Sequence, residues 1–277
     1  FFLCYIGFEI KPMAAIVMIA IVAVEGIHFA GRLLKKQSVL KKSLLAYCLA
    51  AVLGLGAAAG GVSAVVGSMH FPVVTDTVLG WQHHMMLGLN KDTNGGYSQA
   101  DFDYSTSFSS AEEQHAAELK EIGKRLKDFG VGGYLQHFVK KSARNYFDGC
   151  FGWGGLGETF YTEIFPERGT VLCSLIRSLY YDNTEDTLYR YPALFRQILW
   201  YMVLVLVPFS VFTKRPLDKK RQVAVLSVLG LMLYLQIFEA HARYLYTFVP
   251  IFVFLATEGI DNLRKYLNQK SERRVKK

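Results

Sequence analysis

Long apolar stretches are the feature that most constrains how this chain folds. Each is close to the roughly 20 residues that a helix needs to cross the hydrocarbon core of a bilayer. Lipid offers no hydrogen-bond partners, so a segment that crosses it must satisfy its backbone groups internally, as a helix does. The sequence therefore predicts an all-α polytopic membrane protein. We predict five complete transmembrane helices, at residues 12–30, 44–67, 197–213, 223–238 and 244–260.

Composition agrees with a membrane location. Hydrophobic residues make up 52% of the 277 residues, and this surplus of apolar surface needs lipid to cover it. The net charge of +8 raises the question of nucleic acid as a partner, but the charge is unevenly spread. Residues 68–194 carry 16 acidic and 11 basic groups, so the positive excess lies beside the apolar stretches. This distribution excludes nucleic acid and leaves the lipid bilayer as the partner.

Basic segments alternate with the apolar stretches and predict the orientation. The loop at residues 31–43 contains five Lys or Arg residues and no acid, and further basic segments follow the third predicted span and end the chain. Cationic segments of this kind remain at the cytoplasmic face. We therefore expect a multi-pass protein of the cell membrane, with residues 68–193 extracytoplasmic and the C-terminus cytoplasmic.

Four parts follow from these patterns. Residues 1–67 contain transmembrane helices and the cytoplasmic loop 31–43, residues 68–193 form an extracytoplasmic domain, residues 194–261 contain three transmembrane helices, and residues 262–277 form a basic cytoplasmic tail. The first apolar run, residues 1–8, is too short to span a bilayer. We expect the chain to begin inside a truncated helix, as the C-terminal part of a longer protein.

The polar domain at residues 68–193 is predicted to be mostly helical. Residues 92–98 contain the turn-forming sequence Asp-Thr-Asn-Gly-Gly-Tyr-Ser. Ser110 followed three residues later by Glu113 is typical of a helix N-terminus. Glycines at positions 130, 132 and 133 should stop this helix before a second helical pattern begins. Residues 170–181 are apolar but short, so we expect them to lie in the membrane interface.

Three groups of polar residues are predicted to meet at the outer membrane surface. Lys11 lies at the end of the first apolar run, His83 and His84 open the polar domain, and Glu239 and Arg243 lie in a short turn between two spans. Cations at this depth suit the phosphate of a lipid-linked sugar. Lys11 and Arg243 also fit the simpler role of interfacial anchors whose side chains reach the headgroups. Both interpretations remain open at this stage.

Metal and cofactor signals are weak. Adjacent histidines seldom point at one ion, and the chain contains neither His-x-x-x-His nor Cys-x-x-Cys. No cofactor is evident, and no residue is assigned as a metal ligand. Binding of a divalent cation is left open. Cys150 and Cys173 are either a disulfide or two free thiols.

Aromatic residues and glycines are interleaved after residue 150. Phe151, Trp153, Phe160 and Tyr161 fit a surface on which a sugar stacks, and equally a loop that rests on the bilayer.

Several stretches of the chain together resemble a family of Gram-positive bacterial integral membrane proteins. This family is similar in turn to GT-C glycosyltransferases of the dolichyl-phosphate-mannose mannosyltransferase type. The resemblance covers essentially the whole chain, as a C-terminal half. The matching stretches are His84-Met85-Met86-Leu87-Gly88-Leu89-Asn90, then Asn94-Gly95-Gly96-Tyr97 with Asp101, then Lys141 to Asp148-Gly149, and Glu239-Ala240-His241-Ala242-Arg243-Tyr244 with Pro250.

The resemblance implies transfer of a sugar from a polyprenyl-phosphate donor to a cell-envelope acceptor at the outer face. It also places the catalytic acid in a first outer loop, to which no part of this chain corresponds, so no catalytic residue is assigned. Lys11, His83, His84, Glu239 and Arg243 are the candidate residues for the donor phosphate or sugar. The alternative function is a non-catalytic membrane component of cell-envelope polysaccharide assembly or export.

Overall fold

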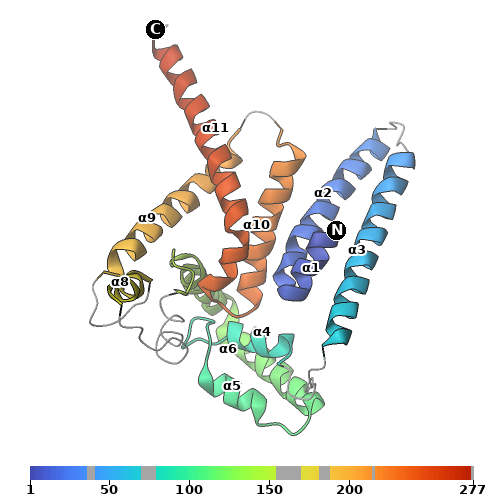
Figure 1. The fold of residues 1–277 in the computed structure, drawn as a ribbon, viewed down its shortest axis with the longest axis vertical. Helices are drawn as coiled ribbons and strands as arrows, with labels where there is room; N and C mark the ends of the chain where they lie inside the picture. The colour runs from blue at the N-terminus through green and yellow to red at the C-terminus, as the bar shows by residue number, and fades with distance from the viewer. Residues whose placement is uncertain (36–40, 70–78, 154–169, 181–187, 214–215, 276–277) are drawn as a thin grey trace. The chain divides into compact units, whose positions relative to one another are not determined.

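The computed structural model describes residues 1–35, 41–69, 79–153, 170–180, 188–213 and 216–275. These residues form helices and turns, and no strand occurs among them (Figure 1). The protein is thus an all-α polytopic membrane protein. Its chain divides into two compact units, residues 1–78 with 215–234 and residues 79–214 with 235–277. Parts of loop 31–43, which is predicted to be cytoplasmic, lie outside the described residues, as do Phe160 and Tyr161 of the aromatic stretch.

Among the described residues, five helices are long and apolar enough to cross a membrane, as the apolar stretches predict. They cover Pro12–Leu34, Leu45–Ser68, Arg190–Ser210, Lys219–Ile237 and Ala242–Ser271. Two boundaries differ clearly from the prediction. The third span begins at residue 190 instead of 197, because Pro192 lies in its first turn, where a proline costs no hydrogen bond. The fifth continues beyond residue 260, since a helix need not end where its apolar stretch ends.

The first unit contains α1 (Phe2–Ile10), the short 3-10 helix η1 (Pro12–Ala14), α2 (Ala15–Leu34), α3 (Lys41–Ser68) and most of α10 (Lys219–Ile237). Polar side chains connect α2 and α10. Lys219 Nζ contacts both carboxylate oxygens of Glu25 at 2.7 and 2.8 Å, and His28 Nε2 lies 2.9 Å from Gln222 Oε1. These contacts give the two polar residues near the end of the first complete span a partner on another helix.

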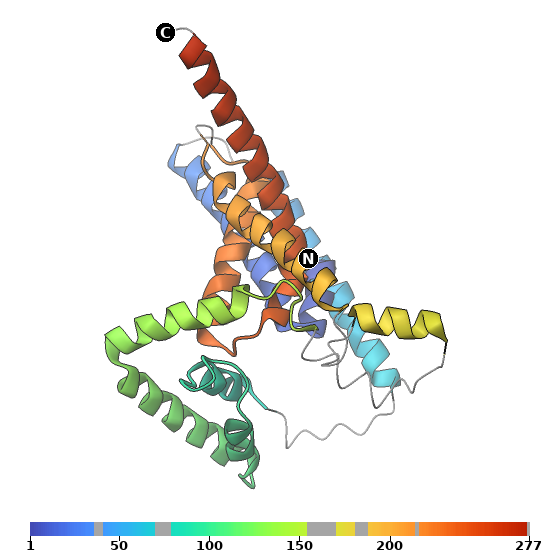
Figure 2. The same ribbon diagram turned by 90° about the vertical axis from the view of Figure 1, so that its left-hand side faces the viewer.

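In the second unit, three helices of the polar domain pack together: α4 (Trp81–Gly88), α5 (Gln99–Thr106) and α6 (Ala111–Tyr146). The predicted helix start is confirmed, because Ser110 Oγ accepts a hydrogen bond from the Glu113 amide at 3.2 Å. The predicted break is confirmed as well: Gly130 has φ 56° and ψ −178°, a backbone conformation open in practice to glycine alone. Figure 2 shows the resulting sharp bend in α6.

The remaining helices of the second unit are α8 (Val171–Tyr180), α9 (Arg190–Leu206), η2 (Val207–Ser210), η3 (Ala242–Phe248) and α11 (Val249–Val275). Asn262 on α11 donates hydrogen bonds to the carbonyl oxygens of Phe209 and Ser210 at 3.0 and 3.1 Å. This contact holds α11 against η2, which directly follows α9 in the chain. From this contact, α9 and α11 diverge along their length (Figure 1). Pro250 lies in the first turn of α11 and causes no kink.

Candidate functional site

The turn between α10 and η3 is held by a buried lysine from the polar domain. Lys141 is fully buried, and its Nζ donates hydrogen bonds to the carbonyl oxygens of Gly88 and Gln236 at 2.8 and 2.9 Å. Both carbonyls belong to the last turn of a helix, where the helix dipole favours a cation. Burial lowers the pKa of Lys141 to about 7, although the charge of Glu239 opposes the shift.

The Asn94-Gly95-Gly96 turn contacts the same segment from another side. The Ala240 amide donates to the Gly95 carbonyl at 2.6 Å, and Gly95 has a positive φ of 79°. A Cβ atom on Gly96 would overlap the Arg144 guanidinium, so a larger residue there would displace this side chain. Arg144 Nε in turn donates to the Ala240 carbonyl at 3.4 Å. The glycines therefore let the polar domain pack directly on residues 239–241.

A partly buried ion pair holds the polar domain together. Arg125 donates two hydrogen bonds to the carboxylate of Asp101, at 2.7 and 2.9 Å, and a third to the Met86 carbonyl. Burial alone would raise the pKa of Asp101, but the hydrogen bonds from Arg125 and Asn90 outweigh this effect and lower it. Asp101 is thus a structural carboxylate whose oxygens are occupied by these neighbours.

The two adjacent histidines have different surroundings. His83 is 1% exposed, and its Nδ1 lies 2.7 Å from Ser105 Oγ and 3.9 Å from Glu118. Burial and the neighbouring His84 lower the pKa of His83. The side chain of His84 is 45% exposed and faces Glu239. His83 therefore has the contacts of a core residue, whereas His84 reaches solvent; a ligand-binding role stays a prediction for each.

A chain of polar contacts runs from His84 to Arg243. His84 Nδ1 lies 3.7 Å from Glu239 Oε2, which accepts a hydrogen bond from the Tyr244 hydroxyl at 2.7 Å. Arg243 Nη2 donates to the same hydroxyl at 3.3 Å. Burial would raise the pKa of Glu239, but His84, Tyr244 and Arg243 together lower it, so this carboxylate stays ionised at neutral pH.

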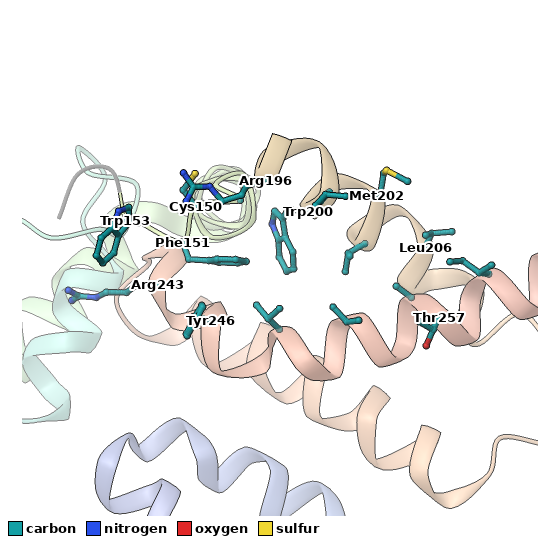
Figure 3. Close-up of a pocket in the computed structure, with 17 residues that line it drawn as sticks. Cys150, Phe151, Trp153, Arg196, Trp200, Met202, Leu206, Arg243, Tyr246 and Thr257 are labelled. Atoms are coloured by element: carbon teal, nitrogen blue, oxygen red, sulfur yellow. The ribbon is translucent and has the colours of Figure 1, made fainter. Parts of the chain in front are cut away.

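Beside this chain, an apolar groove of about 950 Å³ lies between α9 and α11. Trp200, Met202 and Leu206 line it from α9, and Val253 and Ile260 line it from α11. Figure 3 shows Arg196 and Arg243 together with Cys150, Phe151 and Trp153 at one end, and Leu206 and Thr257 toward the other. The groove therefore has an apolar length and a cationic end.

Arg196 is the residue at that end whose bonding is incomplete. Its Nε donates to the Pro192 carbonyl at 3.1 Å, while its Nη2 is buried and has no hydrogen-bond partner in the described part of the chain. Buried donors nearly always have a partner, so the unpaired Nη2 leaves hydrogen-bonding capacity in a residue that lines the groove. A phosphate or carboxylate oxygen is the acceptor that Arg binds best.

Of the predicted site residues, the structure brings His84, Glu239 and Arg243 into one cluster. Lys11 belongs to the other unit, where its amide donates to the Gly7 carbonyl at 2.8 Å, and its proximity to the others stays a prediction. Cys150 and Cys173 are free thiols. Within the described ranges no three His, Cys, Asp or Glu side chains are grouped so as to hold a metal ion.

Sequence reasoning missed Arg196, Lys141 and the hydroxyl of Tyr244 as members of this region. Lys141 and Tyr244 lie within the stretches that carry the family resemblance, which was the available signal for them. Arg196 gave no signal, because a cation at the end of an apolar stretch looks the same whether it anchors the helix or lines a groove.

The membrane-spanning helices and the helical domain between them define a polytopic α-helical membrane protein. The chain belongs to the family of conserved hypothetical integral membrane proteins, whose profile matches residues 1–262. Searches of curated proteins and of solved structures returned no match.

Proposed function

We propose that this protein binds a polyprenyl-phosphate-linked sugar and transfers the sugar to a cell-envelope acceptor at the outer face of the membrane. The groove between α9 and α11 is the observation that carries the proposal, because it joins an apolar length to two arginines. An isoprenoid chain has the apolar character of the groove, and its phosphate has the charge that Arg196 and Arg243 complement.

The resemblance to GT-C glycosyltransferases supports transfer chemistry at this position. In direct displacement, an acceptor hydroxyl attacks the sugar carbon while cations stabilise the leaving phosphate. Arg243 lines the groove and also ends the polar chain from His84, so a phosphate there would lie next to ionisable groups. In the proposed orientation, residues 79–153 and the arginine end of the groove are extracytoplasmic, and the C-terminus is cytoplasmic.

A non-catalytic function in polysaccharide assembly or export is the second candidate. The same groove would then hold a lipid-linked glycan without breaking its phosphate bond. Release of polyprenyl phosphate from a polyprenyl-phosphate hexose distinguishes the two functions, because only the transferase produces it.

Substitution of the groove arginines tests the proposed donor site. We expect Arg196→Ala and Arg243→Ala each to weaken binding of polyprenyl phosphate by about 10-fold or more, since a hydrogen bond to a charged group contributes roughly 1.5–3 kcal/mol. Binding is measured with the full-length protein in lipid nanodiscs. Arg190→Ala is the matched control, because Arg190 is an exposed arginine on the same helix that does not line the groove.

Two results would contradict the proposed site. One is an affinity within threefold of the unsubstituted protein for both groove variants. The other is equal binding of polyprenol, which has the same chain without the phosphate.

A further inference from the structure

The His84 and Glu239 pair combines an accessible imidazole with a buried carboxylate. The Glu239 side chain is 5% exposed and that of His84 is 45% exposed. His84 Nδ1 faces the carboxylate, which leaves Nε2 on the far side of the ring, with no hydrogen-bond partner among the described residues. At 3.7 Å the pair lies within ion-pair distance, so the carboxylate acts on the imidazole through its charge.

We propose that His84 is the proton acceptor for the acceptor hydroxyl and that Glu239 positions and charges it for this role. The proposal rests on the proposed function, since it assigns a catalytic residue to that reaction, and it differs from the resemblance, which implies a catalytic acid in a first outer loop. It places the acceptor on the exposed side of His84, next to the arginine end of the groove, to which Tyr244 and Arg243 connect the pair.

Among Glu239, Tyr244, Arg243 and His84, only His84 can accept the proton. Glu239 is nearly buried and its Oε2 is occupied by Tyr244. Tyr244 donates its hydroxyl proton to Glu239, and Arg243 has no acceptor atom. The charged or titratable groups that face the pair are His83 from α4, Lys141 from α6, and His241, Arg243 and Tyr244 from the turn and η3.

The step balances as follows. The acceptor oxygen forms a bond to the anomeric carbon of the donor sugar while the bond from that carbon to the phosphate oxygen breaks. The hydroxyl proton moves to His84 Nε2, and the leaving polyprenyl phosphate keeps the bonding electron pair. Glu239 stabilises the imidazolium until its proton passes to water on the exposed side.

A purely structural role predicts a different outcome from a catalytic one. A partly exposed ion pair contributes at most about 1 kcal/mol to stability, so replacing His84 by a neutral polar residue should leave the fold and the groove intact. Loss of a general base, by contrast, lowers turnover by roughly 100-fold or more.

The test measures donor turnover by the full-length protein in proteoliposomes, with a polyprenyl-phosphate hexose as the probe and release of polyprenyl phosphate as the readout. We expect His84→Gln to lower kcat about 100-fold with less than a threefold change in donor affinity. His115→Gln, a histidine replacement elsewhere in the polar domain, should keep wild-type turnover. External imidazole should restore part of the activity of His84→Ala.

Glu239→Gln provides a readout that a structural role would not move. Because the carboxylate stabilises the positive charge that develops on the imidazole during the step, its loss should lower kcat about 10-fold or more with less than a threefold change in donor affinity. Wild-type turnover in His84→Gln, or wild-type kcat in Glu239→Gln, would overturn the pair while leaving the donor site standing. Failure of the unsubstituted protein to bind or turn over the donor would instead overturn the proposed function, and the pair with it.

Discussion

At the scale of single residues, Lys141 is the side chain with the most unusual surroundings. A protonated lysine has three donors, whereas a neutral one has two, and two carbonyl oxygens accept hydrogen bonds from Nζ. The site therefore satisfies the neutral amine fully, in agreement with a pKa of about 7. The contact between the polar domain and the turn at residues 236–241 can thus persist after the lysine loses its proton.

Lys141 should make stability depend on pH in a defined window. The unfolded lysine keeps its proton to about pH 10, whereas the folded one loses it near pH 7. Raising the pH through this range therefore favours the folded state, by about 2 kcal/mol between pH 7 and pH 9. Thermal unfolding in detergent should show wild-type stability rising over this range relative to Lys141→Met, with no such divergence below pH 6. Parallel profiles of the two proteins would contradict the assignment.

Candidate site residues could be predicted from the sequence more readily than the roles of those residues. His83 and His84 are neighbours in sequence, but successive residues of a helix point about 100° apart, so α4 directs one into the core and the other outward. Sequence patterns could not assign the two directions, because the short helix α4 has no clear apolar face. Glu239 and Arg243 were identified from their place in a turn, but their link through Tyr244 depends on side-chain geometry.

At the scale of helices, the number of spans could be predicted because apolar length alone decides it. Their ends could not, since charged residues continue a helix into water as readily as they end it. Arg190 and Tyr191 extend α9 at its N-terminus, and residues 261–275 extend α11 at its C-terminus. The N-terminus of α6 was predictable from Ser110 and Glu113, and its bend from Gly130, because capping and positive φ are local properties.

The groove is a property of two helices together. Neither α9 nor α11 shows it alone, because both present apolar residues around much of their circumference and only their divergence from η2 creates the space. Arg196 and Arg243 are 47 positions apart in the sequence, so nothing local indicated that they line one groove.

At the scale of the whole molecule, orientation follows from the basic segments, and cysteine labelling tests it. In a cysteine-free background, Ala116→Cys in α6 should react with a membrane-impermeant maleimide in intact cells. Ser271→Cys near the C-terminus is the control and should react only after permeabilisation, because cationic segments remain cytoplasmic. Reaction of Ala116→Cys only after permeabilisation would reverse the proposed orientation and move the arginine end of the groove to the cytoplasm.

Stretches far apart in the sequence converge on residues 236–241. α4 contributes Gly88 and His84, the glycine turn contributes Gly95, and α6 contributes Lys141 and Arg144. The polar domain is thus built directly onto the turn that contains Glu239. In the account proposed here, it positions the proton acceptor beside a lipid-phosphate groove formed by α9 and α11.

Photo-cross-linking of a lipid phosphate tests this account most directly. A polyprenyl phosphate with a diazirine in its isoprenoid chain is irradiated with the full-length protein in proteoliposomes, and adducts are located by mass spectrometry. The predicted adducts fall on Met202 and Val203 of α9 and on Val253 of α11, and excess polyprenyl phosphate removes them while polyprenol does not. Adducts spread over the outer faces of the helices, or competed equally by polyprenol, would contradict the account.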